Sequence, residues 1–171
     1  MFMKRVLSLC LAVLLGLVCF GAYFREEMPV GSVGTGIAVG TSAIPPKVLH
    51  KIRITAGEDV VYGVLYDTPC GRGISQQLPI TKEITPPADF AKAFVLDERI
   101  ESDEELTSVY VPGGLAYWPT GNAVAIFHTP ERDMTDVPII HFGKIDKGEE
   151  IFAEYDGEIT IERYDESETE E

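Results

Sequence analysis

The chain of 171 residues has few cysteines and few basic side chains, and each shortage excludes a class of protein. Of its three Cys, Cys10 and Cys19 lie in an apolar N-terminal run. Only Cys70 is left for the rest of the chain, which therefore cannot form an intrachain disulfide. Lys and Arg number 14 against 28 Asp and Glu, giving a formal net charge of −14. Such a charge repels phosphate backbones and anionic headgroups, so we expect no nucleic-acid partner.

Metal and cofactor motifs are also missing. His128 and His141 fall on neighbouring strand candidates, but no spaced third ligand accompanies them, so structural roles are favoured over a metal site. The acidic run at residues 97–105 lacks the alternating ligands and central Gly of a calcium loop. The glycines of residues 31–40 lack the strand and the terminal Gly-Lys of a phosphate-binding loop. We expect no metal and no cofactor, and no catalytic residue is assigned.

Residues 1–24 predict an export segment. A short leader ending in Lys4 and Arg5 precedes Val6–Phe24, a run of 19 residues without charge. This pattern is typical of a signal peptide, and the run is also long enough for a retained membrane anchor. Both fates place the domain outside the cytoplasm. Residues 25–47 are rich in Gly and Pro without hydrophobic periodicity, and they predict a linker.

A domain of short strands is predicted over residues 48–164. Polar and apolar residues alternate over His50–Thr55, and β-branched and aromatic residues fill Val60–Tyr66, so these segments predict a hairpin. A last hairpin is predicted from Ile151–Tyr155 and Glu158–Tyr164 around an Asp-Gly turn. Residues 165–171 predict an acidic, solubilising tail.

One short helix is predicted after the first hairpin. Thr68 suits the N-cap and Pro69 the first helical position. Cys70, Ile74 and Leu78 recur every four residues and share one face, which favours a buried thiol over a reactive one. Next, Ile80–Ile84 predicts a strand that a Pro-Pro pair ends. The following segments are an apolar one ambiguous between strand and helix, Phe90–Leu96, and a solvated loop, residues 97–105.

The central stretch, residues 109–129, alternates strands with Gly-containing turns. Strands are predicted at Val109–Val111, Leu115–Trp118 and Ala123–His128, and a further strand within Val137–Asp146 after a polar loop. The whole domain then has about eight short strands with turn signals at regular intervals. This count predicts a mainly β fold, a closed antiparallel barrel or a sandwich, with one or two short helices.

Three blocks of this sequence resemble the small bacterial and archaeal cyclophilin-like proteins. The first, Gly113–His128, has a Gly-containing turn, an aromatic pair, Pro, Gly-Asn and an apolar strand ending in an aromatic residue. Ile139–Ile145 resembles a later strand of that family, and Ser75–Ile80 resembles its helix-end motif, Ser-x-x-Leu-Pro. The blocks occur in the family's order. The resemblance implies a closed antiparallel β-barrel like that of cyclophilins.

The resemblance does not extend to the residues of prolyl isomerisation. True cyclophilins use the Arg of a Phe-His-Arg block and the Gln of a Gln-Phe-Phe strand. This chain contains no Phe-His-Arg, and Ala125, Ile126 and Phe127 stand where the Gln strand would be. A divergent isomerase or folding helper therefore remains an alternative to a binding domain without catalysis.

We expect the domain to bind a small molecule or peptide in an apolar pocket. The candidate lining residues are Tyr117, Trp118, Asn122, Phe127 and His128. Adjacent residues on a strand point to opposite faces, so at most one of the two aromatics Tyr117 and Trp118 faces the interior. A third possibility is an interaction module, in which the acidic residues 165–171 contact a basic partner.

Overall fold

The computed structural model describes residues 46–130 and 134–165, which belong to one compact unit, Ala43–Glu171. The predicted export segment, nearly all of the predicted linker and the tail beyond Asp165 lie outside these residues. Within the two described ranges, no helix is both long and apolar enough to cross a membrane.

The described part of the chain forms strands and two short helices. In chain order they are β1 (Val48–Ala56), β2 (Asp59–Tyr66), α2 (Pro69–Gln77), β3 (Ile80–Glu83), β4 (Thr85–Ala88), β5 (Ala91–Val95), β6 (Thr107–Val109), β7 (Gly114–Trp118), β8 (Ala123–Phe127), β9 (Met134–Ile145), α3 (Ile151–Glu154) and β10 (Glu158–Tyr164).

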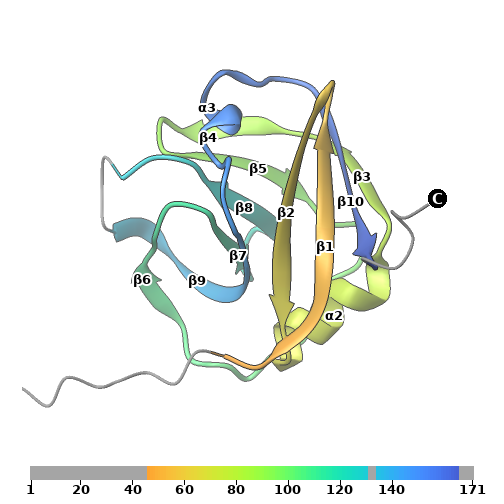
Figure 1. Ribbon diagram of the computed structural model, residues 1–171. Helices are drawn as coiled ribbons and strands as arrows, with labels where there is room; N and C mark the ends of the chain where they lie inside the picture. The colour runs from red at the N-terminus through yellow and green to blue at the C-terminus, as the bar shows by residue number, and fades with distance from the viewer. Residues whose placement is uncertain (1–45, 131–133, 166–171) are drawn as a thin grey trace, which may run out of the picture. The chain divides into compact units, whose positions relative to one another are not determined.

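All strands belong to one antiparallel arrangement. Their order is β3-β10-β1-β2-β9-β7-β8-β5-β4, and β6 pairs with β9 beside this path. Figure 1 shows β1 and β2 side by side as the predicted first hairpin, with α2 near one end of these strands and α3 near the other. The mainly β class and the two short helices are as predicted.

The sheet is open, so the predicted closed barrel is wrong. Its end strands, β3 and β4, are consecutive in the chain and separated only by Ile84, yet among the described residues no ladder joins them. The amide of Ile84 donates instead to the Gly157 carbonyl at 2.9 Å. Pro86 and Pro87 occupy half of β4 and have no amide hydrogen for a ladder. They also do not end the extended segment as predicted, because an edge strand tolerates proline.

Helix α2 begins as the sequence predicts, and it is capped twice. The Thr68 side chain accepts a hydrogen bond from the Gly71 amide at 3.1 Å. The Glu104 carboxylate accepts a second one from the Cys70 amide at 2.6 Å. The predicted solvated loop at residues 97–105 is therefore tied to the domain, and its Ile100 is buried in the core.

Two predicted strands differ from the structure. Ile151–Glu154 is a single helical turn, α3, because this turn buries Phe152 completely. The last strand, β10, consequently pairs with β1 and β3 and not with a hairpin partner. The strand predicted at Val109–Val111 lies earlier, at β6, because the pairing with β9 runs from Thr107 to Val109.

Alternating side chains separate two apolar clusters on the two faces of the sheet. The larger cluster contains Leu115, Tyr117, Val124 and Ile126, together with the core side of β1, β2, β9 and β10. The smaller cluster is formed by the intervening positions of β5, β7, β8 and β9. Phe90, just before β5, and Tyr110, just after β6, complete it. It consists of Phe90, Ala91, Tyr110, Ala116, Phe127 and Ile139, with Ala88, Trp118, Ala125 and Val137 packed against it.

Candidate functional site

A row of three alanines crosses strands β7, β8 and β5 on the face of the smaller cluster. Ala116 of β7 pairs with Ala125 of β8, and Ala125 pairs in turn with Ala93 of β5. Paired residues of adjacent strands lie side by side on the same face. We call these residues, Ala116, Ala125 and Ala93, the alanine row. Because each side chain is a single methyl group, the row is lower than its surroundings.

One aromatic side chain stands on each side of the alanine row. On one side, Trp118 pairs with Ala123, and Ala123 pairs with Val95. On the other side, Phe127 pairs with Ala91. Each flanking position is two residues along its strand from the row, or about 7 Å. Ala93 and Ala125 therefore form the floor of a trough between aromatic side chains, whereas Ala116 is fully buried within the smaller cluster.

The wall beside Phe127 is a stack of rings. The centroid of Phe127 lies 4.4 Å from that of Tyr110 and 6.2 Å from that of Phe90, with ring planes within 22° of parallel. Phe90 and Tyr110 are themselves stacked at 5.1 Å. Such contacts fix the ring of Phe127 and make the wall rigid.

This trough forms a pocket of about 570 Å³, within the size range of small-molecule sites. We call it the apolar pocket. Its lining comes from β4, β5, β7, β8 and β9, together with the end of β3 and Phe90. The lining residues are Glu83, Thr85, Pro87, Ala88, Phe90, Ala91, Ala93, Phe94, Val95, Trp118, Ala123, Ala125, Phe127, Thr135, Asp136, Val137 and Ile139.

Two of the five predicted site residues line the apolar pocket, namely Trp118 and Phe127. Tyr117 is fully buried in the larger cluster on the opposite face of β7. Its hydroxyl accepts a hydrogen bond from the Ile100 amide at 3.2 Å and donates one to Asn122 Oδ1 at 2.9 Å. The strand alternation thus gives this pair of aromatics one interior and one pocket residue.

Asn122 and His128 hold the chain near the pocket without lining it. The Asn122 side chain donates to the Leu96 carbonyl at 2.9 Å, and its backbone has φ of 48° at the end of the Pro119–Asn122 turn. The left-handed region suits Asn at a turn. His128 is buried, and its amide donates to the Phe90 carbonyl at 3.1 Å. The hydrogen bond from His128 places Phe90 beside the strand that carries Phe127.

Sequence reasoning missed the alanine row and Phe90. The alternating small residues Ala123 and Ala125 were a signal for one shallow strand face. Nothing in the sequence pairs them with Ala93 and Ala116, because the strands concerned come from separate segments of the chain.

The other candidate side chains have structural surroundings. Burial, and then the nearby Glu104 carboxylate, raise the pKa of the Cys70 thiol to about 12, which makes the thiol unreactive near neutral pH. His141 lies on β9, and β7 separates that strand from β8, which precedes His128. The His141 ring contacts the Val109 carbonyl at 2.8 Å. No group of three or more potential metal ligands occurs within the described ranges.

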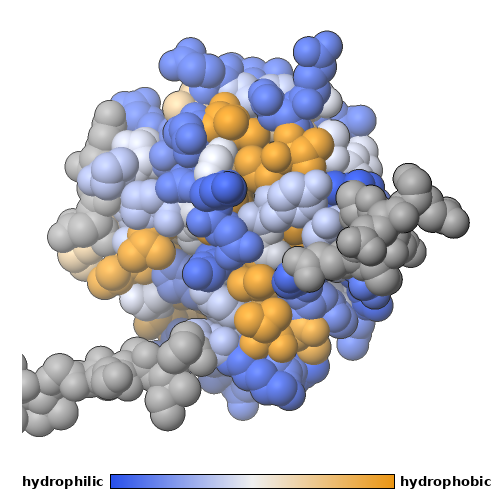
Figure 2. Space-filling view, viewed as in Figure 1, coloured by the Kyte–Doolittle hydropathy of each residue, from blue (hydrophilic) through white to orange (hydrophobic). Residues whose placement is uncertain are grey.

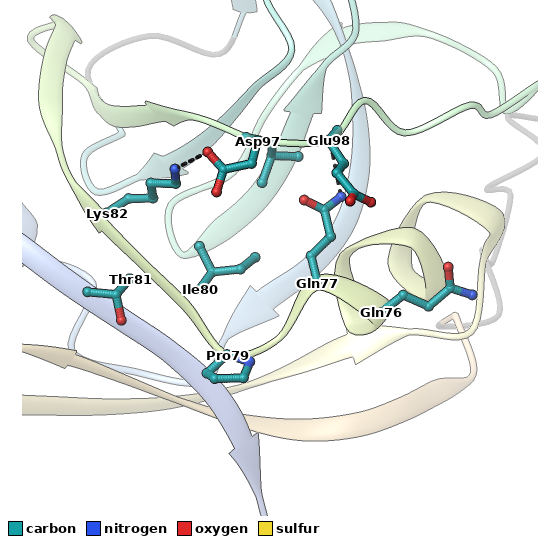
Figure 3. A pocket seen from close by; sticks show the side chains of 9 residues that line it. Gln76, Gln77, Pro79, Ile80, Thr81, Lys82, Asp97 and Glu98 are labelled. Carbon is teal, nitrogen blue, oxygen red and sulfur yellow. Dashed lines mark hydrogen bonds and ion pairs between the residues drawn. The ribbon is translucent and has the colours of Figure 1, made fainter.

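A second hollow, of about 400 Å³, lies between the end of α2, β3 and the residues after β5. Figure 3 shows that most side chains around it are polar, with Pro79 and Ile80 among them, and that Lys82 and Asp97 point toward each other. Lys82 Nζ lies 2.5 Å from Asp97 Oδ1. Gln77 donates to the Glu98 carbonyl at 3.2 Å. Two pairs of the polar groups that line this hollow thus bond to each other, so the hollow offers a ligand less than the apolar pocket does.

Apolar side chains are also exposed outside the apolar pocket. Figure 2 shows a largely hydrophilic face with separate hydrophobic patches, one of them over β6 and the start of β9. Val109 and Met134, which pair there, are 54% and 52% exposed. Neither residue lines the apolar pocket.

Comparison with known proteins agrees with this architecture. Residues 54–162 match the sequence profile of the Cyclophilin-like family. The solution structure of a hypothetical protein from Archaeoglobus fulgidus is similar, with a TM-score of 0.57 and 23% sequence identity over 70% of this chain and 98% of that one. At this identity the likeness concerns the fold. No curated protein matches the sequence.

Proposed function

The chain belongs to the Cyclophilin-like family, and from that premise we propose that its domain binds a small molecule or peptide whose apolar part fills the apolar pocket. One observation carries this proposal. Ala93 and Ala125 lie between the side chains of Trp118 and Phe127, so the sheet face has a depression of ligand size that larger side chains at these two positions would fill.

Two physical arguments support binding at this place. Each ligand methylene that leaves water there gains about 0.8 kcal/mol. The stacked rings of Phe90, Tyr110 and Phe127 are already ordered without a ligand, so binding does not include the entropic cost of ordering them.

Trp118 is the only tryptophan of the chain and lines the apolar pocket, so its fluorescence reports binding there even when the full chain is used. We would titrate the protein with phenylbutanol, a neutral aromatic alcohol, and with proline-containing peptides. Saturable changes in Trp118 emission are expected for at least one of these probes. A flat response to all of them would contradict the proposal.

A filling variant makes the test specific. Ala125→Leu places three extra carbons over the centre of the alanine row and should weaken binding at least tenfold by occupying the ligand's place. Ala153→Leu, at an exposed position of α3, is the matched control and should bind as the natural protein does. Equal weakening in both variants would show that the site lies elsewhere.

The two other functions predicted from the sequence are separated by the same assay. A prolyl isomerase would accelerate cis–trans exchange of a bound peptide. However, none of the lining residues of the apolar pocket is Arg, Lys or Gln. An interaction module that uses the acidic tail would lose binding when residues 165–171 are deleted, whereas the apolar pocket would keep its ligand.

We also propose that the domain acts outside the cytoplasm, either released or held at the membrane through residues 6–24. The basic leader and the uncharged run of 19 residues support this. Fractionation of cells that produce the full chain, followed by mass spectrometry of its N-terminus, tests it. Recovery of the intact chain from the cytoplasm would contradict it.

A further inference from the structure

Resting on the proposed function, we infer that the ligand of the apolar pocket is a small organic cation, an amine attached to an apolar chain or ring. The inference comes from the charges at the rim of the pocket. Two lining residues, Glu83 and Asp136, carry a formal charge at neutral pH, and both are acidic. Both are also exposed, so their carboxylates can meet the solvated head of a ligand.

The two acidic residues reach the pocket from separate strands. Glu83 ends β3 and directly precedes β4, the strand that pairs with β5. Asp136 lies in the part of β9 that pairs with β6, between Met134 and Ile139. A ligand in the apolar pocket therefore meets an acidic residue on two different elements of the lining.

Two lysines on the adjoining strands are engaged elsewhere. Lys92 of β5 is buried on the core face, and its Nζ lies 2.6 Å from Asp156 Oδ1. Lys82, next to Glu83 on β3, pairs with Asp97 at 2.5 Å. Both lysines are thus held away from the pocket rim by other carboxylates.

The aromatic wall adds a second attraction for a cation. An ammonium group within about 6 Å of an indole ring is favoured by the charge distribution of the ring, and Trp118 stands at the rim of the trough. The net charge of −14 draws cations toward the protein from a distance. An anionic amphiphile is disfavoured by each of these contributions.

The chemistry of the lining favours a small amine over an extended peptide. A peptide brings backbone amides and carbonyls that need hydrogen-bond partners once buried. Apart from the two acids and the indole N–H of Trp118, the polar side-chain groups of the lining are the hydroxyls of Thr85 and Thr135. The hydroxyls of these threonines already donate, to the Ala93 and Val137 carbonyls. An alkyl or aryl chain has no polar groups and needs no hydrogen-bond partner in the pocket.

A matched series of probes tests the inference with the full chain and Trp118 fluorescence. Phenylbutylamine, phenylbutanol and phenylpentanoate all carry a phenyl ring on four methylenes and differ in the charge of the head group. We expect the amine to bind roughly two- to fivefold more tightly per rim carboxylate than the alcohol. The pentanoate should bind most weakly, and added salt should reduce the differences.

Charge-removing variants locate the effect. Glu83→Gln and Asp136→Asn should each lower the affinity for the amine by roughly two- to fivefold and leave that for the alcohol unchanged. Glu58→Gln, in the turn between β1 and β2 and outside the pocket lining, removes the same charge and should change neither.

Two results would overturn the inference while leaving the proposed function intact. One is an alcohol that binds as tightly as the amine. The other is an amine preference that Glu58→Gln reduces as much as the rim variants do, since it would then come from net charge alone. If none of the three probes changes Trp118 emission, the inference fails, and the binding proposal fails with it when the proline-containing peptides cause no change either.

Discussion

The hydroxyl of Tyr117 donates a hydrogen bond of 2.9 Å to Oδ1 of Asn122 and so closes the turn between β7 and β8 from inside the core. The same oxygen accepts the amide hydrogen of Ile100 at 3.2 Å. One buried hydroxyl therefore connects the turn to the acidic loop at residues 97–105. The strands that carry the alanine row meet at this turn.

Removing that hydroxyl should destabilise the fold. Tyr117→Phe removes the partner of the buried Ile100 amide and of the part-buried Asn122 Oδ1. We expect a loss of about 1–3 kcal/mol in the free energy of unfolding, measured by urea denaturation. Tyr62→Phe, at a 42% exposed tyrosine, is the control and should change little. Similar losses in both variants would argue against the hydrogen bonds as the cause.

The carboxylate of Glu104 should stabilise helix α2. It accepts the Cys70 amide at the first turn of the helix and also contacts Ser102 Oγ at 2.8 Å. Glu104→Ala should lower the free energy of unfolding by about 1 kcal/mol, because the Cys70 amide and the positive end of the helix dipole then lose their partner. The neighbouring exposed Glu105→Ala serves as control. Thermal or urea unfolding of the two variants should separate them.

Acid should destabilise the domain in part through His50. Its ring lies 2.6 Å from Ser75 Oγ, which also accepts a hydrogen bond from Arg163 at 3.1 Å. Partial burial, and then the charge of Arg163, lower the pKa of His50 below its usual 6.5. Protons therefore bind the unfolded chain more tightly. The free energy of unfolding is highest above pH 6.5 and falls as the pH drops toward the lower pKa of the folded state.

The variant His50→Gln should lose this part of the pH dependence. Unfolding by urea at neutral pH and at about pH 5 gives the comparison. Asp67 does not interfere, because hydrogen bonds from Lys47 and then Arg72 lower its pKa, so its contribution is lost only in stronger acid. If the free energy of unfolding of His50→Gln falls with pH as much as that of the natural protein, His50 is not the group responsible. His141→Gln reports the effect of replacing another histidine.

The pair formed by Lys92 and Asp156 should respond asymmetrically to mutation. The Lys92 side chain is 5% exposed and that of Asp156 is 72% exposed. Asp156→Ala leaves a buried ammonium without its partner and should lower the free energy of unfolding by about 1–3 kcal/mol. Lys92→Met keeps the apolar stem and leaves a solvated carboxylate, so it should hardly change the free energy of unfolding.

The double variant Lys92→Met with Asp156→Ala should recover the stability lost in Asp156→Ala alone. Chemical denaturation of the four proteins completes the cycle. A loss in Lys92→Met as large as in Asp156→Ala would mean that the pair itself stabilises the fold.

Local patterns in the sequence were enough to predict several elements. The alternation at His50–Thr55 and the β-branched run at Val60–Tyr66 form the hairpin of β1 and β2, and Thr68 caps α2. These signals act between residues close in sequence. Ile151–Glu154 was predicted wrongly because its apolar residues fit a strand as well as a helix, and only the burial of Phe152 decides between them.

Of the candidate site, the sequence indicated Trp118 and Phe127 as lining residues of an apolar pocket, and both do line the apolar pocket of the structure. It could not place Tyr117, because a strand pattern shows that neighbours face opposite ways but not which way each faces. It also gave Asn122 and His128 as lining residues, whereas their hydrogen bonds hold Leu96 and Phe90.

The sequence alone thus determined a mainly β domain, its acidic character, the start of α2 and the residue types available for a pocket. Propensity, charge and capping act over a few residues, so a single sequence reveals them. The tertiary structure decided that the sheet stays open between β3 and β4, and that Ala93, Ala116 and Ala125 lie in one row. Both depend on the register between strands distant in sequence, and that register is fixed only when the whole core packs.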